Sequence, residues 1–302
     1  MTIKEALNRI YTRYKLSPLD AEILLSLSTG KPKEYILAHP EKNLTKFQLK
    51  KYISFTKRRS TGEPIAYITK KKEFFGLEFF VNRNVLIPRP ETELLVESLL
   101  EKISNAEYEI PDTILDVGTG SGNIIISIVK NIPKKIQNRI NFIATDISKK
   151  VLGVAKENAK RHNVSRKIKF IQSNLLEYFL KNNKMRSRNF FIVANLPYVS
   201  PNTYDSNKNN LKYEPAGALI SSEKGLMHYK NLFREIKNIW QTNHGIGITG
   251  FFEISPEQKP EIGRIIRKIL PNIRTIFRKD LAGRWRCLEL RIQSESNLEK
   301  NK

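Results

Sequence analysis

The chain has 302 residues, 40% of them hydrophobic, so it is long enough for two domains and a sizeable core. The single cysteine, Cys287, excludes an internal disulfide, and the four scattered histidines lack ligand-like spacing, so we expect no metal site. No apolar run reaches the roughly 20 residues of a membrane span, and the N-terminus lacks the apolar core of a signal peptide. These features predict a cytoplasmic protein.

The charge is strongly positive, with a formal net charge of +23. Residues 1–72 contain 16 Lys/Arg and 6 Asp/Glu, so the excess is densest in the N-terminal part. One interpretation is a polyanionic partner, such as a nucleic acid, that is attracted electrostatically. The other is compositional: the chain is rich in Lys, Ile and Asn together, as an AT-rich genome would produce, and lysine is then the default surface residue. Both interpretations stay open.

The first 72 residues are predicted to form a small helical domain. Apolar residues recur at helical spacing over 3–11. A Ser-Pro pair begins a second helix over 17–28, which a Thr-Gly pair ends. Further helices are expected over 33–38 and, after a threonine N-cap, over 45–59. This part of the sequence contains no catalytic constellation.

The residue pattern changes after residue 65. The segment 73–82 alternates apolar and polar residues around Gly76, which predicts a β-hairpin in the connector between two domains. Two prolines and two glutamates over 88–93 then favour the start of a helix over 91–104, because proline and acidic residues suit a first helical turn.

Short apolar strands alternate with helices from residue 113 onward. This alternation predicts a parallel, doubly wound sheet. The expected strands are 113–117, 140–146, 168–174, 190–194, 245–254 and 284–292, and the helices between the first three are 123–130 and 148–162. The predicted organisation is a helical domain (1–72), a β-hairpin connector (73–88), a catalytic domain (89–293) and a disordered polar tail (294–302).

A glycine loop follows the first of these strands. Gly118, Gly120 and Gly122 alternate, which permits a tight strand-to-helix turn and close approach of a ligand to the backbone. The spacing is tighter than the G-x-G-x-x-G of dinucleotide folds, so it favours a cofactor built from an amino acid and a nucleoside. Asp146, at the end of the next strand, can accept hydrogen bonds from ribose hydroxyls. The Gly-Lys-Ser/Thr of a P-loop is lacking.

A second chemical signal follows the strand 190–194. Asn195-Leu196-Pro197-Tyr198 places an amide side chain, backbone carbonyls and an aromatic ring at one extended corner, because the residue before a proline avoids the helical region. Such a corner can hold a flat, NH2-bearing group. Adenine and glutamine both fit that description.

These motifs together resemble a known family. The glycine loop with Asp116 and Asp146 resembles class I S-adenosylmethionine (SAM) methyltransferases, and 195–198 resembles their amino-methylating branch. The whole set is similar to the PrmC/HemK family, the protein-(glutamine-N5) methyltransferases of peptide-chain release factors. The further stretches that carry this resemblance are 62–68, 73–76, 86–93, 213–219 and 280–284.

The resemblance implies a Rossmann-like class I methyltransferase sheet and an enzyme that uses SAM. Nothing in the sequence argues strongly against a monomer. It implies methyl transfer to the side-chain amide nitrogen of the glutamine in the Gly-Gly-Gln motif of release factors. The helical domain over 1–72 matches that of the family in size and kind only, and we expect it to recognise the protein substrate.

Site residues follow from the same resemblance. Asn195 and the Leu196 carbonyl would accept the two N–H bonds of the substrate amide, with Pro197 restraining the corner and Tyr198 packing on the amide. The implied cofactor-binding residues are Asp116, Gly118, Thr119, Gly120, Ser121, Gly122, Asp146, Asn174, Leu175 and Asn195. Arg89 and Glu214 are implied as substrate-binding residues beside the corner.

Two residues depart from the family pattern. Leu196 replaces the first proline of the usual Asn-Pro-Pro-Tyr motif, which also fits an adenine-amino methyltransferase acting on RNA or DNA. Asn174 stands where an aspartate is common, which would suit a basic ribosome- or RNA-binding module with a degenerate SAM site. The flanking segments favour glutamine as the substrate.

Overall fold

The computed structural model describes the chain except for residues 106–109, 183–187, 208–210, 244–245, 272 and 294–302. The predicted tail over 294–302 and the start of the strand predicted from 245 therefore lie outside the described residues. The chain divides into two compact units, Met1–Lys71 and Lys72–Lys302.

The first unit is helical, as its apolar spacing predicted. Its helices are α1 (Ile3–Tyr14), α2 (Pro18–Thr29), α3 (Lys33–Ala38), α4 (Lys46–Ser60) and α5 (Ile65–Thr69). The predicted N-cap Thr45 forms a capping box with Gln48, and Gly30 ends α2 in the left-handed region. Leu24, Leu25 and Tyr52 are buried in its core. Helix α5 was not predicted from the sequence, because its five residues are too few to show a helical period.

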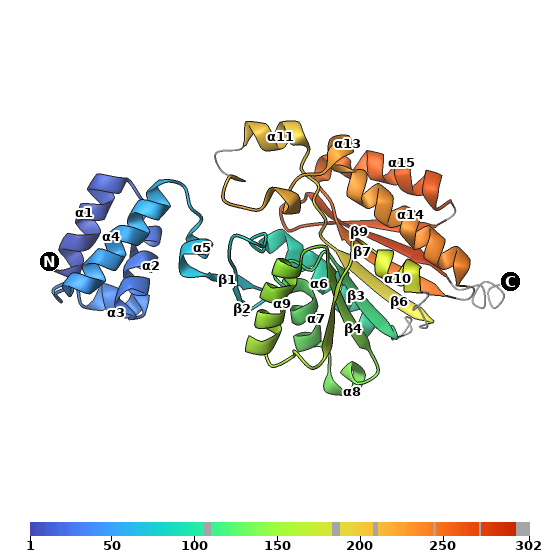
Figure 1. Cartoon of the computed structure of the whole chain (residues 1–302), viewed down its shortest axis with the longest axis horizontal. Helices are drawn as coiled ribbons and strands as arrows, with labels where there is room; N and C mark the ends of the chain where they lie inside the picture. Colours follow the sequence, from blue (N-terminus) through green and yellow to red (C-terminus); the bar gives the residue numbers. More distant parts are fainter. Residues whose placement is uncertain (106–109, 183–187, 208–210, 244–245, 272, 294–302) are drawn as a thin grey trace. The chain divides into compact units, whose positions relative to one another are not determined.

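The second unit is built on one seven-stranded sheet (Figure 1). Its strands are β3 (Thr113–Val117), β4 (Asn141–Asp146), β5 (Ile168–Gln172), β6 (Asn189–Ala194), β7 (Gly247–Glu253), β8 (Arg274–Lys279) and β9 (Trp285–Ile292), in the order β5-β4-β3-β6-β7-β9-β8. The first five strands in this order are parallel, as predicted, whereas β9 runs antiparallel to both neighbours. The short loop after β8 leaves no room for the helical crossover that a parallel neighbour needs.

Helices cover both faces of the sheet (Figure 1). On one face pack α6 (Glu93–Ser104), α7 (Asn123–Asn131) and α9 (Lys149–Arg161); on the other pack α10 (Glu177–Asn182), α14 (Met227–Thr242) and α15 (Lys259–Ile269). Alternate residues of β6 follow this division, because Phe191 packs with the first set and Phe190 with the second. The second unit is thus the doubly wound α/β fold that the sequence predicted.

The predicted hairpin is present as β1 (Lys71–Phe74) and β2 (Leu77–Phe80). Phe75 and Gly76 at its turn both have positive φ, the conformation of a tight two-residue hairpin turn. Phe74 and Phe79 are buried in the same core as α6 and α7. The hairpin therefore belongs to the core of the second unit.

The remaining elements are short. They are α8 (Lys134–Gln137), α11 (Pro201–Ser206), α13 (Ser222–Gly225), and the 3-10 turns η1 (Pro90–Thr92), η2 (Ala216–Ala218) and η3 (Pro256–Gln258). Within the described ranges, no helix combines the length and apolar character needed to cross a membrane.

Candidate active site

The strand order brings the two sequence motifs together. The chain runs from β3 outward through β4 and β5, then returns to β6 on the other side of β3. Val117 is the register partner of Ala194, so Gly118 and Asn195 follow neighbouring strand ends. Ligands of open α/β sheets bind at such a switch point.

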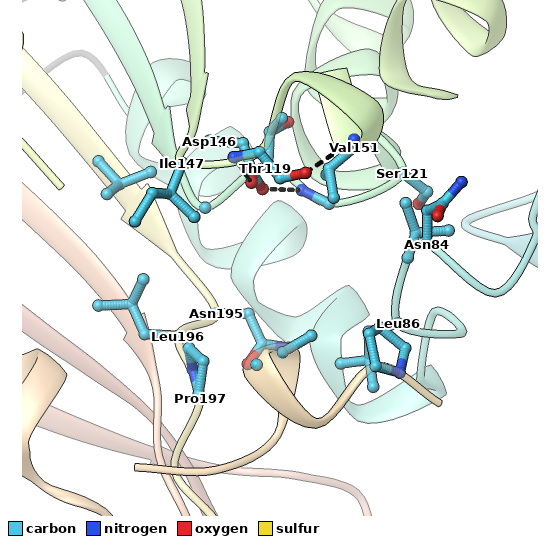
Figure 2. A pocket seen from close by; sticks show the side chains of 18 of the residues that line it. Asn84, Leu86, Thr119, Ser121, Asp146, Ile147, Val151, Asn195, Leu196 and Pro197 are labelled. Carbon is cyan, nitrogen blue, oxygen red and sulfur yellow. Dashed lines mark hydrogen bonds between the residues drawn. The ribbon is translucent and has the colours of Figure 1, made fainter. Parts of the chain in front are cut away.

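A cavity of about 620 Å³ opens at this point, within the size range of small-molecule sites. Figure 2 shows Thr119 and Asp146 along one wall and Asn195, Leu196 and Pro197 along the opposite wall, with Asn84 and Leu86 to one side. The predicted site residues that line the cavity are Arg89, Gly118, Thr119, Gly120, Ser121, Asp146, Asn174, Leu175, Asn195, Leu196 and Pro197. Those that do not line it are Asp116, Gly122, Tyr198 and Glu214.

The three loop glycines all have positive φ, and two are tightly enclosed. A Cβ at Gly118 would lie 3.1 Å from Leu196 Cδ2, and one at Gly122 would lie 3.0 Å from Ile126 Cδ1. At Gly120 the nearest atom to an added Cβ is 4.0 Å away, so that side of the loop is open. The backbone is thus exposed where a ligand would approach.

Asp116 lies beneath the glycine loop and is fully buried. Its Oδ2 accepts a hydrogen bond from the Thr119 hydroxyl (2.7 Å), which fixes the turn. Its Oδ1 is buried without a hydrogen-bond partner among the described residues. Burial raises the pKa of Asp116 to about 7.

Asp146 joins β4 to the loop. Its Oδ2 accepts from the Gly120 N–H (3.2 Å), and its Oδ1 accepts from the Ser148 N–H (3.0 Å) at the start of α9. Burial raises the pKa of this carboxyl group, although these backbone donors favour its charged form. A carboxylate is therefore held at the cavity wall beside the glycine loop.

Leu175 is held in an unusual conformation at the cavity. Its φ is +47°, a region that a side chain with a Cβ rarely adopts. The Ser173 hydroxyl donates to the Leu175 carbonyl (3.0 Å) and accepts from the Tyr178 N–H (3.1 Å), so the turn is fixed from within. Backbone strain of this kind is concentrated at ligand sites. Its neighbour Asn174 is exposed.

The Asn195 side chain has a defined orientation. Its Nδ2 donates to the Thr92 hydroxyl (3.0 Å), which directs the amide nitrogen to the end of η1. Among the described residues no group donates to Asn195 Oδ1. The oxygen is therefore available as an acceptor on a residue that lines the cavity.

The Leu196 peptide is fixed from behind. Its N–H donates to the buried Tyr229 hydroxyl (3.2 Å), and that hydroxyl donates to the carbonyl of Glu253 at the end of β7. No described residue donates to the Leu196 carbonyl. The adjacent Asn195 and Leu196 thus offer two oxygen acceptors at one corner.

Tyr198 extends away from the cavity wall. Its hydroxyl donates to Glu253 Oε1 (3.1 Å), and its carbonyl accepts from Gln258 Nε2 (3.1 Å). Burial raises the pKa of Glu253, while hydrogen bonds from Thr92 and Tyr198 oppose that rise. The packing of Tyr198 on a substrate amide stays a prediction.

Glu214 supports the wall that contains Arg89. Its buried carboxylate accepts from the Ile87 N–H (3.2 Å) through Oε2 and pairs with the Arg89 guanidinium through Oε1. Arg89 lines the cavity, whereas Glu214 acts from behind it. The two predicted substrate residues are therefore brought together as an ion pair.

Several site residues were missed by the sequence analysis. They are Thr92, Tyr229 and Glu253, together with Asn158, whose buried amide bonds to the Phe80 backbone and the Ser121 carbonyl. Glu253 carried a usable signal, because it is a lone carboxylate in the apolar run 251–254. Thr92 and Tyr229 carried none, because a threonine in a helix start and a tyrosine in an apolar helix face are ordinary.

Two family models match the chain. The PrmC N-terminal domain matches residues 3–69, and a methyltransferase domain matches residues 111–244. A release factor glutamine methyltransferase of Clostridium botulinum is 33% identical over 90% of this chain and 91% of its own length. The chain belongs to the release factor glutamine methyltransferase family.

Other relatives are matched over different shares of their own length. The Mycoplasma mycoides release factor glutamine methyltransferase is 32% identical over 95% of this chain and 97% of its own length. The Rickettsia bellii bifunctional methyltransferase is 33% identical over 91% of this chain. The chain spans about half the length of that and the other Rickettsia relatives.

A solved structure supports the fold. The hMettl16 catalytic domain in complex with MAT2A 3'UTR hairpin 1 matches with a TM-score of 0.51 at 17% identity, covering 90% of each chain. The predicted Rossmann-like class I methyltransferase sheet is confirmed. The match to the methyltransferase domain over residues 111–244 spans strands β3 to β6 of this sheet.

The cavity fits SAM. The open side of Gly120 leaves space beside the loop backbone, and the Asp146 carboxylate can accept from ribose hydroxyls. Leu175, Ile147 and Val151 supply apolar wall suited to a flat base. No cluster of three metal-ligating side chains is found in the described part of the chain.

Proposed function

We propose that the chain methylates the side-chain amide nitrogen of the glutamine in the Gly-Gly-Gln motif of release factors. The relatives that it matches over almost their whole length have names that specify this reaction class. The observation that carries the proposal is the pair of acceptors at the corner, Asn195 Oδ1 and the Leu196 carbonyl. A primary amide has two N–H bonds, and two adjacent acceptors complement them.

The proposed chemistry depends on position. SAM, when bound, supplies an activated methyl group on a sulfonium, which is a good leaving group. An amide nitrogen is a weak nucleophile because its lone pair is delocalised into the carbonyl. Acceptance of both N–H bonds by Asn195 and Leu196 orients that nitrogen and stabilises the positive charge that develops on it. The spare proton then leaves to solvent.

The remaining corner residues have supporting roles in this proposal. The Leu196 acceptor is a backbone carbonyl, so leucine can supply it in place of proline. Pro197 restrains the backbone of Leu196, and Leu196 also packs against the loop at Gly118. Arg89, held by Glu214, would contact the substrate backbone beside the glutamine.

Cofactor roles are proposed for the opposite wall. Asp146 would bind the ribose hydroxyls, and the backbone of Gly118–Ser121 would bind the amino-acid end of SAM. Asn174 would accept from the adenine amino group through its amide oxygen, without the charge of an aspartate. Asp116 and Gly122 support this wall from beneath, because neither lines the cavity.

We assign substrate recognition to the N-terminal helical unit, whose net positive charge suits an acidic protein surface or a ribosome-bound partner. The monomeric state and the cytoplasmic location stay predictions.

Labelling with tritiated SAM tests the proposed function. The substrates are purified release factor, its Gly-Gly-Gln-to-Gly-Gly-Ala variant, and ribosomal RNA. We expect label in the release factor and none in the variant or the RNA. Label in RNA alone would favour an adenine-amino methyltransferase. No label anywhere, with no SAM binding by calorimetry, would favour a binding module.

A further inference from the structure

The turn after β5 lies between two cavities. Asn174 and Leu175 line the cavity of about 620 Å³, and they also line a second cavity of about 280 Å³, which Arg234 and Glu235 of α14 line as well. A turn with open space on both sides depends on hydrogen bonds more than a turn enclosed by core packing does. The bonds that hold this turn therefore determine the shape of the cavity wall on its side.

The peptide between Leu175 and Leu176 is held at both of its polar groups. Its carbonyl accepts from the Ser173 hydroxyl (3.0 Å). Its N–H donates to Glu235 Oε2 (2.8 Å), which comes from α14, 59 residues away along the chain. The orientation of this peptide sets the ψ angle of Leu175, the residue with a φ of +47°. The Glu235 side chain thus constrains the strained residue directly.

Another bond of the turn is local, because the Asn174 carbonyl accepts from the Glu177 N–H (3.0 Å). The bond to Glu235 instead ties the turn to a distant helix. Without it, the N–H of the fully buried Leu176 would lose its acceptor. A left-handed residue with a Cβ persists only where its surroundings impose that conformation. Rotation of the freed peptide would relieve the strain and move the Leu175 side chain.

The proposed function places the adenine base of SAM against Asn174 and Leu175. Building on that proposal, we propose that Glu235 is a positioning residue for the cofactor. Its carboxylate fixes the peptide that presents the Leu175 side chain and the neighbouring Asn174 amide to the base. When the acceptor is lost, the peptide rotates and the adenine wall loses its shape.

The surroundings of Glu235 agree with this role. Burial raises the pKa of Glu235, and the hydrogen bond from the Leu176 N–H opposes that rise. No described lysine or arginine forms an ion pair with this half-buried carboxylate. The carboxylate therefore gives up part of its hydration at a place where the turn supplies a donor.

Two conservative variants separate reach from charge. Glu235→Gln keeps an acceptor oxygen at the same reach but loses the charge, whereas Glu235→Asp keeps the charge on a side chain that is one methylene shorter. By calorimetry, we expect Glu235→Gln to bind SAM within about threefold of wild type and Glu235→Asp to bind it about tenfold more weakly. The reverse order, or equal affinity of the two variants, would overturn the proposal.

The amino group of adenine gives a second readout. S-adenosylhomocysteine is compared with the analogue in which purine, without the 6-amino group, replaces adenine. The ratio of the two dissociation constants cancels a general loss of stability. We expect wild type and Glu235→Gln to prefer the adenine compound roughly fivefold, and Glu235→Asp to lose that preference because Asn174 is no longer held. Equal ratios in wild type and Glu235→Asp would overturn the proposal.

The matched control is Arg234→Gln. Arg234 lines the same second cavity from the preceding position of α14, but within the described residues it makes no hydrogen bond to the turn. We expect its SAM affinity and its preference for adenine to equal those of wild type, and a loss as large as that of Glu235→Asp would overturn the proposal. Release factor is absent from these measurements, so their outcome is independent of which group accepts the methyl group. Labelling of release factor tests that separately.

Discussion

We expect Asp116 to make the stability of the second unit depend on pH. Its carboxyl group is fully buried beneath the glycine loop, and burial raises its pKa from 3.8 to about 7. A rise of that size corresponds to about 4 kcal/mol. Because the folded state favours the protonated form, the stability from this group is present below about pH 4 and is lost as the pH rises to about 7. Asp116→Asn has no charge to bury.

Urea unfolding followed by tryptophan fluorescence measures this effect. Both tryptophans, Trp240 and Trp285, belong to the second unit, so the signal reports on it. Relative to wild type, we expect Asp116→Asn to gain about 4 kcal/mol in unfolding free energy between about pH 4 and about pH 7. The exposed Asp205→Asn is the control and should follow wild type. Parallel curves for wild type and Asp116→Asn would refute the reasoning.

Three further changes test how the site is supported. Asn158→Ala leaves the Phe80 and Ser121 backbone groups unpaired. We therefore expect the unfolding free energy in urea to fall by roughly 2–4 kcal/mol and SAM to bind more weakly by calorimetry. Unchanged SAM affinity would contradict this role of Asn158. Gly225→Ala puts a Cβ 2.0 Å from the Tyr198 carbonyl, so it should lower the thermal midpoint, whereas Gly153→Ala, with open space, should not. Glu214→Gln removes the ion pair that holds Arg89, so it should lower kcat/KM for release factor roughly tenfold without changing SAM affinity. A parallel loss of SAM affinity would argue against a role of this pair in substrate binding.

The sequence predicted those parts of the fold that follow from local chemistry. The helix caps at Ser17 and Thr45 and the hairpin around Gly76 depend on neighbouring residues, and the structure has them as expected. The antiparallel direction of β9 could not be predicted in this way, because the direction of a strand depends on the strands beside which it packs. The long helix α14 was not predicted, although its apolar residues recur at helical spacing.

The candidate site divides in the same way. The glycine loop and Asn195 were identifiable because each belongs to a short run of consecutive residues with a distinctive composition: three alternating glycines in one, and an asparagine before Leu-Pro-Tyr in the other. Thr92 contacts Asn195 and Glu253 contacts Tyr198, each from a segment more than 50 residues away, so these contacts depend on the fold. Asp116 was predicted to bind the cofactor, yet it lies beneath the loop, because a side chain inside a buried strand need not face the cavity at its end.

The most direct test of the central claim is a single-turnover measurement with Asn195→Ala. The account predicts that this variant binds SAM as wild type does, because Asn195 acts on the substrate amide, but transfers no methyl group to the release-factor glutamine. Mass spectrometry of the Gly-Gly-Gln peptide gives the readout. Normal transfer by Asn195→Ala would contradict the claim that the Asn195 oxygen and the Leu196 carbonyl hold the amide for reaction.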